Sequence, residues 1–210
     1  MKAVTAISVP IALMLGLTGL SPLQAQTESK LLTALSSNRS PKSCSINNTQ
    51  FNFASGWSAV YSTLTNNAAI SPDGTKDASS IADNTNNQQH NIYLTAGMPE
   101  SASVQYAFTC YEKAGTGAFA GIAFATAGFA AGFYANANLS TCAITQTGTY
   151  GTGAYVTSSA RWISNGWCRV SVTGTFSAST TAFPSISTLP NGTTNPNALY
   201  IGTGTGIYIY

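Results

Sequence analysis

Hydrophobic and polar residues alternate along much of this chain with the two-residue period of β-strands. Downstream of Cys44, runs of roughly five to eight aromatic and β-branched residues are separated by turn sequences such as Pro-Asp-Gly, Ser-Asn-Gly and Pro-Asn-Gly. No segment in this part of the sequence has a convincing helical period. The pattern predicts an all-β fold, an antiparallel two-sheet β-sandwich over residues 44–210.

Alternation is clearest in residues 106–113, 167–173 and 207–210. In the first two segments, one face is expected to enter the core: Tyr106, Phe108, Cys110, Cys168, Val170 and Val172. The opposite face is expected to lie outside the core: Thr109, Tyr111, Lys113, Trp167, Arg169 and Ser171. In the last segment, isoleucines alternate with tyrosines in the same way: Ile207, Tyr208, Ile209 and Tyr210.

Residues 118–134 are apolar and uncharged, with glycines at positions 121, 128 and 132. A membrane-spanning helix is one interpretation of such a stretch. Two buried strands around a glycine turn fit better, because the stretch lacks flanking charges and the rest of the domain is rich in β patterns. We therefore expect no membrane span in this domain.

The first residues have the features of a cleavable signal peptide. A positive start, Met1–Lys2, precedes an apolar run from Ala3 to Leu20, and Ser21–Ala25 forms a small-residue cleavage site. We expect residues 1–25 to be removed and residues 26–43 to form a polar extension. The mature chain is then secreted, either periplasmic or extracellular.

Charge is scarce, since only 7% of the residues are charged and the formal net charge is +2. Glycine, alanine, threonine, serine and asparagine fill the surface positions, as in secreted β proteins and assembly subunits. The few cations are scattered, with no basic cluster that would neutralise a phosphate backbone. We expect no nucleic-acid partner.

The four cysteines, Cys44, Cys110, Cys142 and Cys168, are an even number in an expected oxidising compartment and predict two disulfides. Their spacing does not suit a zinc site. Because Cys110 and Cys168 both face the predicted core, the preferred pairing joins Cys110 to Cys168 and Cys44 to Cys142. The sequential pairing, Cys44 with Cys110 and Cys142 with Cys168, remains open.

Five short motifs in order resemble a β-jelly-roll domain of phage tail and virion proteins that is related to the carbohydrate-binding modules of bacterial glycanases. They are Asn48-Thr49-Gln50-Phe51 with Trp57, Pro72-Asp73-Gly74-Thr75 with Ala78, 106–114, Asn165-Gly166-Trp167-Cys168-Arg169-Val170, and 206–210. Cys168 replaces an aromatic residue of that pattern. The signal peptide argues against a virion role, because virion proteins assemble in the cytoplasm.

We expect no catalytic activity, because the sequence supplies six carboxylates and a single histidine, His90, without a nucleophile motif. His90 is expected to be a solvated loop residue. The jelly-roll resemblance allows a structural calcium ion held by Asp73, Asp77 and Asp83. Their spacing matches no recognised calcium loop, so we expect aspartates that form turns, with no metal and no other cofactor.

If the alternating strands share a sheet, their polar face gathers residues suited to sugars, because aromatic rings stack on pyranoses and charged groups bind hydroxyls. The candidate carbohydrate-binding residues are Tyr111, Lys113, Trp162, Trp167, Arg169 and Tyr208, with Tyr210 on the same face. In the competing interpretation, Trp167 and Arg169 pack under a loop. The predicted function is a secreted, non-catalytic module that binds carbohydrate or a cell-surface polysaccharide. The alternative is a structural subunit of an extracellular or virion assembly that self-assembles through Leu31–Leu35.

Overall fold

The computed structural model describes residues 44–47, 49–50 and 52–210. The predicted signal peptide, the polar extension and the assembly segment Leu31–Leu35 therefore lie outside the described residues. Almost every element is a strand, and all strand pairs are antiparallel. No helix in the described part of the chain is long and apolar enough to cross a membrane.

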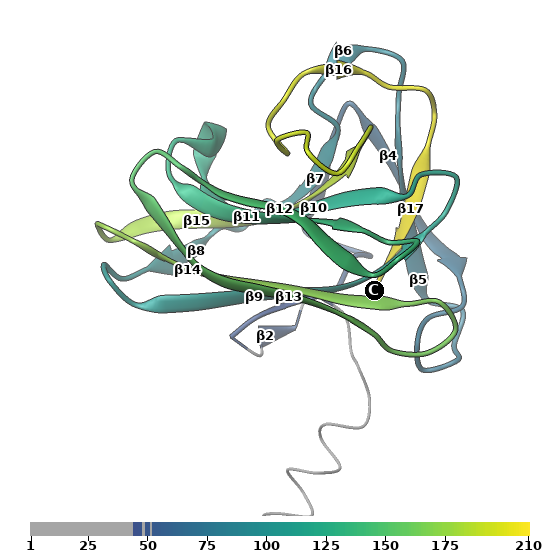
Figure 1. Ribbon diagram of the computed structural model, residues 1–210, viewed down its shortest axis with the longest axis horizontal. Helices are drawn as coiled ribbons and strands as arrows, with labels where there is room; N and C mark the ends of the chain where they lie inside the picture. Colours follow the sequence, from purple (N-terminus) through teal and green to yellow (C-terminus); the bar gives the residue numbers. More distant parts are fainter. Residues whose placement is uncertain (1–43, 48, 51) are drawn as a thin grey trace, which may run out of the picture. The chain divides into compact units, whose positions relative to one another are not determined.

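Sheet A is the lower layer in Figure 1. Its order is β13 (Gly153–Trp162), β14 (Cys168–Phe176), β9 (Gln105–Ala114), β17 (Gly206–Ile209), β5 (Ala78–Asp83) and β4 (Ser62–Ala69). The short strand β1 (Ser45–Ile46) also pairs with β9, and β2 (Thr49–Gln50) pairs with β1. Strands from both ends of the described chain thus meet at β9.

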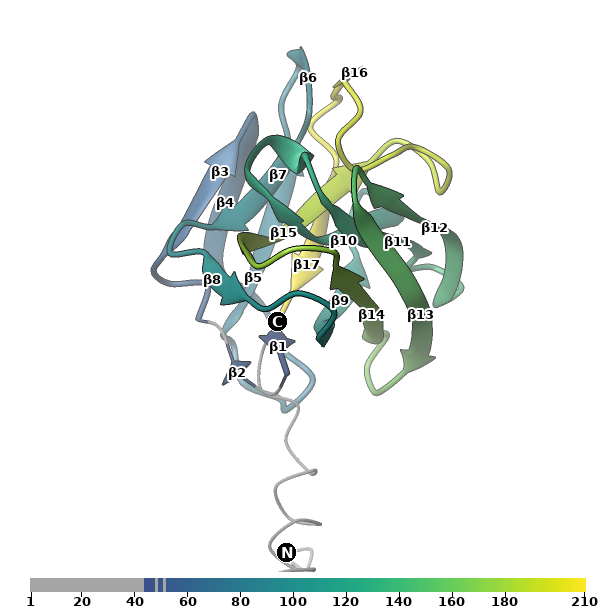
Figure 2. The same cartoon turned by 90° about the vertical axis from the view of Figure 1, so that its left-hand side faces the viewer.

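Sheet B packs over sheet A as the upper layer (Figure 1). Its order is β12 (Ala143–Tyr150), β11 (Gly132–Asn138), β10 (Phe119–Thr126), β15 (Thr180–Leu189), β7 (Asn91–Leu94) and β3 (Trp57–Val60), and β8 (Met98–Glu100) pairs with β15. A separate pair, β6 (Asn87–Gln88) and β16 (Tyr200–Ile201), projects above sheet B (Figures 1 and 2). A short 3-10 turn, η1 (Ala127–Phe129), joins β10 to β11.

The core lies between the two sheets and follows the predicted alternation. Along β14 every second residue is buried, starting with Cys168. The rings of Phe124, Phe133 and Phe176 pack edge to face or tilted, with centroids 5.6 to 6.0 Å apart. The predicted all-β, antiparallel two-sheet sandwich is confirmed. Residues 118–134 also form the two predicted buried strands around a glycine turn.

The preferred disulfide pairing is wrong, and the sequential alternative is the one observed: Cys44–Cys110 and Cys142–Cys168. Ser45 lies opposite Thr109 in the β1–β9 pair, which places Cys44 beside Cys110. The residue of β14 opposite Cys110 is Val170, not Cys168. Cys142, in the turn between β11 and β12, reaches Cys168 from sheet B and links the two layers covalently. Two disulfides are typical of proteins from an oxidising, extracellular environment.

Candidate functional site

Four of the six predicted sugar-binding residues, Tyr111, Lys113, Arg169 and Tyr208, come together on the outer face of sheet A. Strands β14, β9 and β17 are neighbours, with Arg169 opposite Tyr111 and Tyr208 opposite Lys113. All four side chains are half-buried. The Lys113 ammonium donates a hydrogen bond to the backbone oxygen of Asn165 at 2.8 Å, which fixes its position beside the loop before β14.

The prediction that Trp167 belongs to the sugar-binding face is wrong, because its side chain is fully buried. Its indole N–H donates to the backbone oxygen of Ile70 at 3.1 Å, and its ring packs with Ala78 and Tyr210. A buried ring offers no face to a sugar, so the interpretation that it packs under a loop holds. Trp162, at the end of β13, is 48% exposed and is separate from this cluster.

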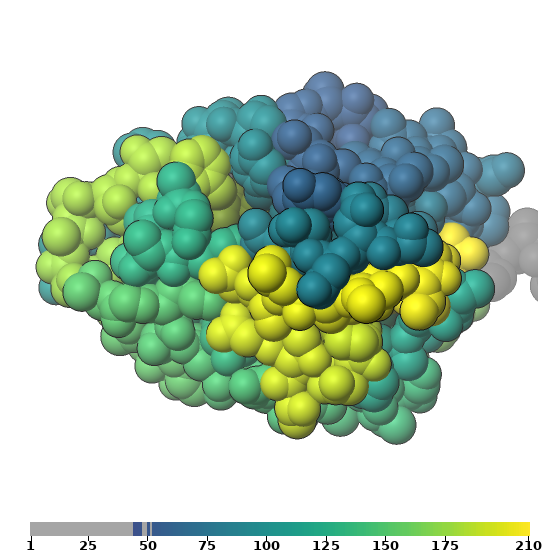
Figure 3. All heavy atoms as spheres, turned by 90° about the horizontal axis from the view of Figure 1, so that it is seen from above, coloured from purple at the N-terminus to yellow at the C-terminus, as the bar shows by residue number. Residues whose placement is uncertain are grey.

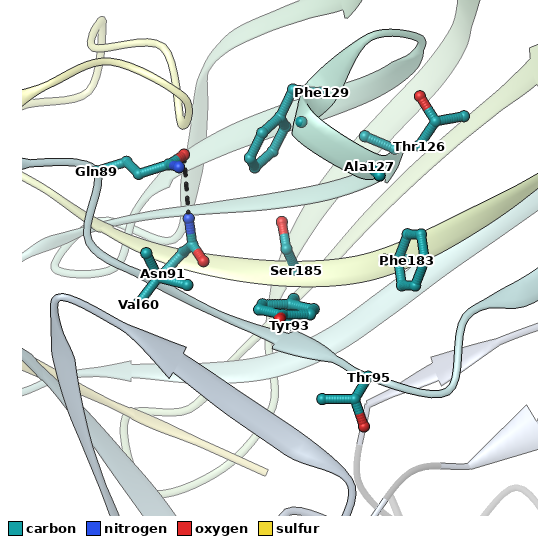
Figure 4. A pocket seen from close by; sticks show the side chains of 12 residues that line it. Val60, Gln89, Asn91, Tyr93, Thr95, Thr126, Ala127, Phe129, Phe183 and Ser185 are labelled. Carbon is teal, nitrogen blue, oxygen red and sulfur yellow. Dashed lines mark hydrogen bonds between the residues drawn. The ribbon is translucent and has the colours of Figure 1, made fainter.

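A hollow with a volume of about 380 Å³ lies on the outer face of sheet B, on the opposite side of the sandwich from these residues. Figure 4 shows it between η1 and strands β7 and β15. It is lined by Val60, Gln89, Asn91, Tyr93, Thr95, Ala125, Thr126, Ala127, Gly128, Phe129, Phe183 and Ser185. Figure 3 views this side from above, and the yellow C-terminal segment lies there against the segment that carries β6, as the β6–β16 pairing requires.

The hollow forms because small residues occupy its floor and aromatic residues its walls. Ser185 of β15 lies opposite Tyr93 of β7 and opposite Ala123 of β10. The Tyr93 and Phe183 rings pack edge to face with centroids 6.4 Å apart. These side chains point outward because Ile92, the alternate residue of β7, enters the core.

The turn η1 places a third ring over the sheet. Gly128 and Phe129 both have left-handed backbone angles, with φ of 64° and 56°, which reverse the chain within a few residues. The turn is held by a hydrogen bond from the Thr126 backbone N–H to the Ala131 oxygen at 2.8 Å. Phe129 then packs against Tyr150 with ring centroids 5.0 Å apart and forms the wall facing Tyr93.

The polar groups of the hollow are uncharged. The Asn91 amide donates to the Gln89 side-chain oxygen at 3.4 Å. The Ser185 hydroxyl is buried and has no hydrogen-bond partner among the described residues, and Figure 4 shows it pointing to the side of the sheet where Phe129 lies. A buried polar atom without a partner costs free energy unless a bound molecule or water satisfies it. The site therefore combines stacking surfaces with amide and hydroxyl groups suited to a neutral, polar ligand.

The prediction that His90 is a solvated loop residue is also wrong, because its side chain is buried. Its Nδ1 lies 2.6 Å from the Tyr61 backbone oxygen and its Nε2 lies 3.1 Å from the Tyr200 backbone oxygen. The ring also packs on Tyr200, with centroids 4.5 Å apart. These contacts give His90 a structural role, because they join β16 to Tyr61 in the connection between β3 and β4.

The aspartates considered for calcium use their oxygens within the protein. Asp83 accepts hydrogen bonds from the backbone N–H groups of Thr203 and Thr205 at 3.1 and 2.8 Å. Hydrogen bonds from Ser71 and Thr75 hold the pKa of Asp73 well below its usual range. Asp77 is exposed. Among the described residues, no three His, Cys, Asp or Glu side chains are grouped in a way that would hold a metal ion.

Compared with known proteins, the chain matches no family model and no curated protein. The sequence motifs did not indicate the hollow, because the candidate sugar-binding residues lie on or next to sheet A and the hollow lies on sheet B. One signal for it was available: in the segment 91–94 a tyrosine and an asparagine alternate with Ile92 and Leu94. The rest of the hollow depends on which distant strands become neighbours of that segment.

Proposed function

We propose that this domain is a non-catalytic carbohydrate-binding module and that its binding site is the hollow on the outer face of sheet B. The observation that carries this proposal is the unpartnered Ser185 hydroxyl on the floor of an uncharged hollow walled by Tyr93, Phe129 and Phe183. Aromatic walls with a few polar groups are the usual composition of sites for small polar ligands.

A pyranose ring fits this composition because it has an apolar face and a rim of hydroxyls. Tyr93 and Phe183 supply the surfaces for stacking. Asn91, Gln89 and Ser185 supply hydrogen-bond donors and acceptors for the hydroxyls. The volume of about 380 Å³ falls within the range of about 300 to 1,000 Å³ common for ligand pockets.

A binding role is favoured over hydrolysis by the lining of the hollow. Glycoside hydrolases use two carboxyl groups that flank the scissile bond. All the lining residues are apolar, hydroxyl or amide residues, without an aspartate or glutamate. The two disulfides support a role outside the cytoplasm, in agreement with the predicted signal peptide.

The test is a glycan array followed by titration calorimetry with the neutral glycan that is retained. Tyr93→Ala should weaken binding about 30-fold, because loss of one stacking ring costs about 2 kcal/mol. Tyr155→Ala is the matched control, since Tyr155 is a 36% exposed tyrosine on β13 of the other sheet. Equal affinities for the wild type and Tyr93→Ala would show that the hollow is not the binding site. An array that retains no glycan would refute the proposed function.

The alternative of a structural subunit rests on Leu31–Leu35, outside the described residues. Electron microscopy of the secreted protein separates the two roles. Filaments would favour assembly, whereas a monomer that binds a glycan favours the module proposed here.

A further inference from the structure

The outer face of sheet A carries a cationic row on the side of the molecule away from the hollow. Arg161 of β13 lies directly opposite Arg169 of β14, and Arg169 lies opposite Tyr111 of β9. Neighbouring residues on an antiparallel pair have Cβ atoms about 5 Å apart on the same face. The two arginines and the tyrosine therefore lie side by side in one row across three strands, with their side chains on the same face of the sheet.

The two arginines are not neutralised within the protein. Neither side chain forms a hydrogen bond or an ion pair with another described residue. Glu112, which follows Tyr111 on β9, points into the core and adds no negative charge to this face. Like charges directly opposite on paired strands repel and destabilise a sheet. An unpartnered arginine pair is thus a structural cost that an anionic ligand would remove.

Cations are concentrated on this face. The described part of the chain has four lysine and arginine residues, and three of them, Lys113, Arg161 and Arg169, lie here, while Lys76 lies in the turn before β5. Each acidic residue in the described part is either buried or in the turn that holds Asp73 and Asp77. The cation surplus is local even though the net charge of the whole chain is only +2.

Hydroxyl side chains form the next row. Ser159, Ser171 and Thr109 lie opposite one another across β13, β14 and β9, and the last two hydroxyls are 2.9 Å apart. Arginine binds carboxylates through two parallel hydrogen bonds, and serine and threonine hydroxyls bind sugar hydroxyls. A polyuronate, which is a polysaccharide built of uronic acids, presents a carboxylate and hydroxyl groups on each sugar unit.

We propose that the outer face of sheet A is a second binding site, selective for an acidic polysaccharide whose uronate carboxylates bind Arg161 and Arg169. The site goes beyond the neutral glycan proposed for the hollow and does not depend on it. Tyr111 provides a flanking ring, and the accessible hydroxyls of Ser159 and Ser171 contact the sugar hydroxyls, while the buried Thr109 hydroxyl lies within hydrogen-bond distance of Ser171. The attraction is largely electrostatic, so affinity falls as salt rises.

The experiment uses calorimetry with polygalacturonate and with its methyl ester, which keeps the backbone and removes the charge. The wild-type full chain should bind the acid at least tenfold more tightly than the ester. Arg169→Gln should weaken binding of the acid about tenfold, which is the loss of one bidentate charge pair. The double variant Arg161→Gln/Arg169→Gln should bind acid and ester alike. Lys76→Gln removes the same charge elsewhere and should change the affinity less than twofold.

Three results would overturn this second site. The first is equal binding of acid and ester by the wild type, and the second is an equal loss in Lys76→Gln and Arg169→Gln, which would show a simple effect of net charge. The third is duplex DNA that competes as well as polygalacturonate, which would show an unselective response to polyanions. Tyr93→Ala should keep polygalacturonate binding, and its loss in that variant would place the acidic ligand in the hollow.

Discussion

Replacing Glu112 with glutamine should remove most of the dependence of the domain's stability on pH between about pH 5 and pH 8. Glu112 lies on the core-facing side of β9, opposite Cys168 of β14 and Ile209 of β17. It is 1% exposed, and neither of its carboxylate oxygens has a hydrogen-bond partner among the described residues. A carboxylate in such a place is strongly favoured in its neutral, protonated form.

The size of the effect follows from linkage between protonation and folding. Burial raises the pKa of Glu112 to about 8 from 4.5. The folded state therefore holds the proton more tightly, so the contribution to stability is full below about pH 4.5 and is lost as the pH rises to about 8. At 1.36 kcal/mol per pKa unit the whole loss is about 5 kcal/mol, and most of it falls between pH 5 and pH 8. Domains are typically stable by about 5 to 15 kcal/mol, so this is a large share.

The assay is urea unfolding of the wild type and Glu112→Gln at about pH 5 and pH 8, with tryptophan fluorescence as the signal. The exposed acid Asp77 supplies the control, because Asp77→Asn should keep the wild-type difference. Burial also raises the pKa of Glu100 to about 7, so Glu100→Gln should remove a separate, smaller part of the difference. If Glu112→Gln loses as much stability as the wild type between the two pH values, Glu112 is not held neutral by burial and the reasoning is refuted.

Three further predictions concern the packing of the domain. Replacing Cys142 and Cys168 together with alanine opens a loop of 26 residues and should cost about 3.5 kcal/mol, lowering Tm by about 10 °C in calorimetry under non-reducing conditions; an unchanged Tm would contradict the link between the sheets. Trp167→Ala should cost about 3 to 5 kcal/mol in urea unfolding, whereas Trp162→Ala should stay within about 0.5 kcal/mol, and equal losses would be inconsistent with their burial. Asp83→Ala should cost about 2 to 3 kcal/mol and increase amide hydrogen exchange in residues 203–205, and unchanged exchange there would show that its hydrogen bonds do not hold this loop.

Local alternation was enough to predict the sandwich and the faces of its clearest strands. The period of two in 167–173 places Val170 and Val172 in the core and Arg169 outside it, as observed. This works because the face of a strand is decided by each residue's immediate neighbours in the sequence. Tyr111, Arg169 and Tyr208 each take the predicted outer face of their own strand for the same reason, but they share one surface only because β14 and β17 both pair with β9.

Pairing between strands could not be predicted in the same way. Cys110 does face the core, but its partner depends on β1, a strand of two residues that is too short to show a pattern. Trp167 stands one residue before β14, where a loop from β4 to β5 covers it, and the alternation of the strand cannot reveal that cover. The hollow is assembled from β7, β10, η1 and β15, and its shape depends on the small side chain of Ser185 as much as on the rings.

The position of β17 sets a limit on when the domain can fold. Residues 206–209 lie inside sheet A, between β9 and β5, and both isoleucines of this strand are buried. Until they have been synthesised, β9 and β5 are left with open edges, and the polypeptide made before them cannot complete the sheet. Folding must then bring β17 together with partners roughly 95 residues away in β9 and roughly 125 residues away in β5, which is slow and exposes a chain to aggregation. A chain ending before Gly206 should therefore accumulate as insoluble protein, even though it contains every residue that lines the hollow, all four cysteines and nearly all of the aromatic core residues.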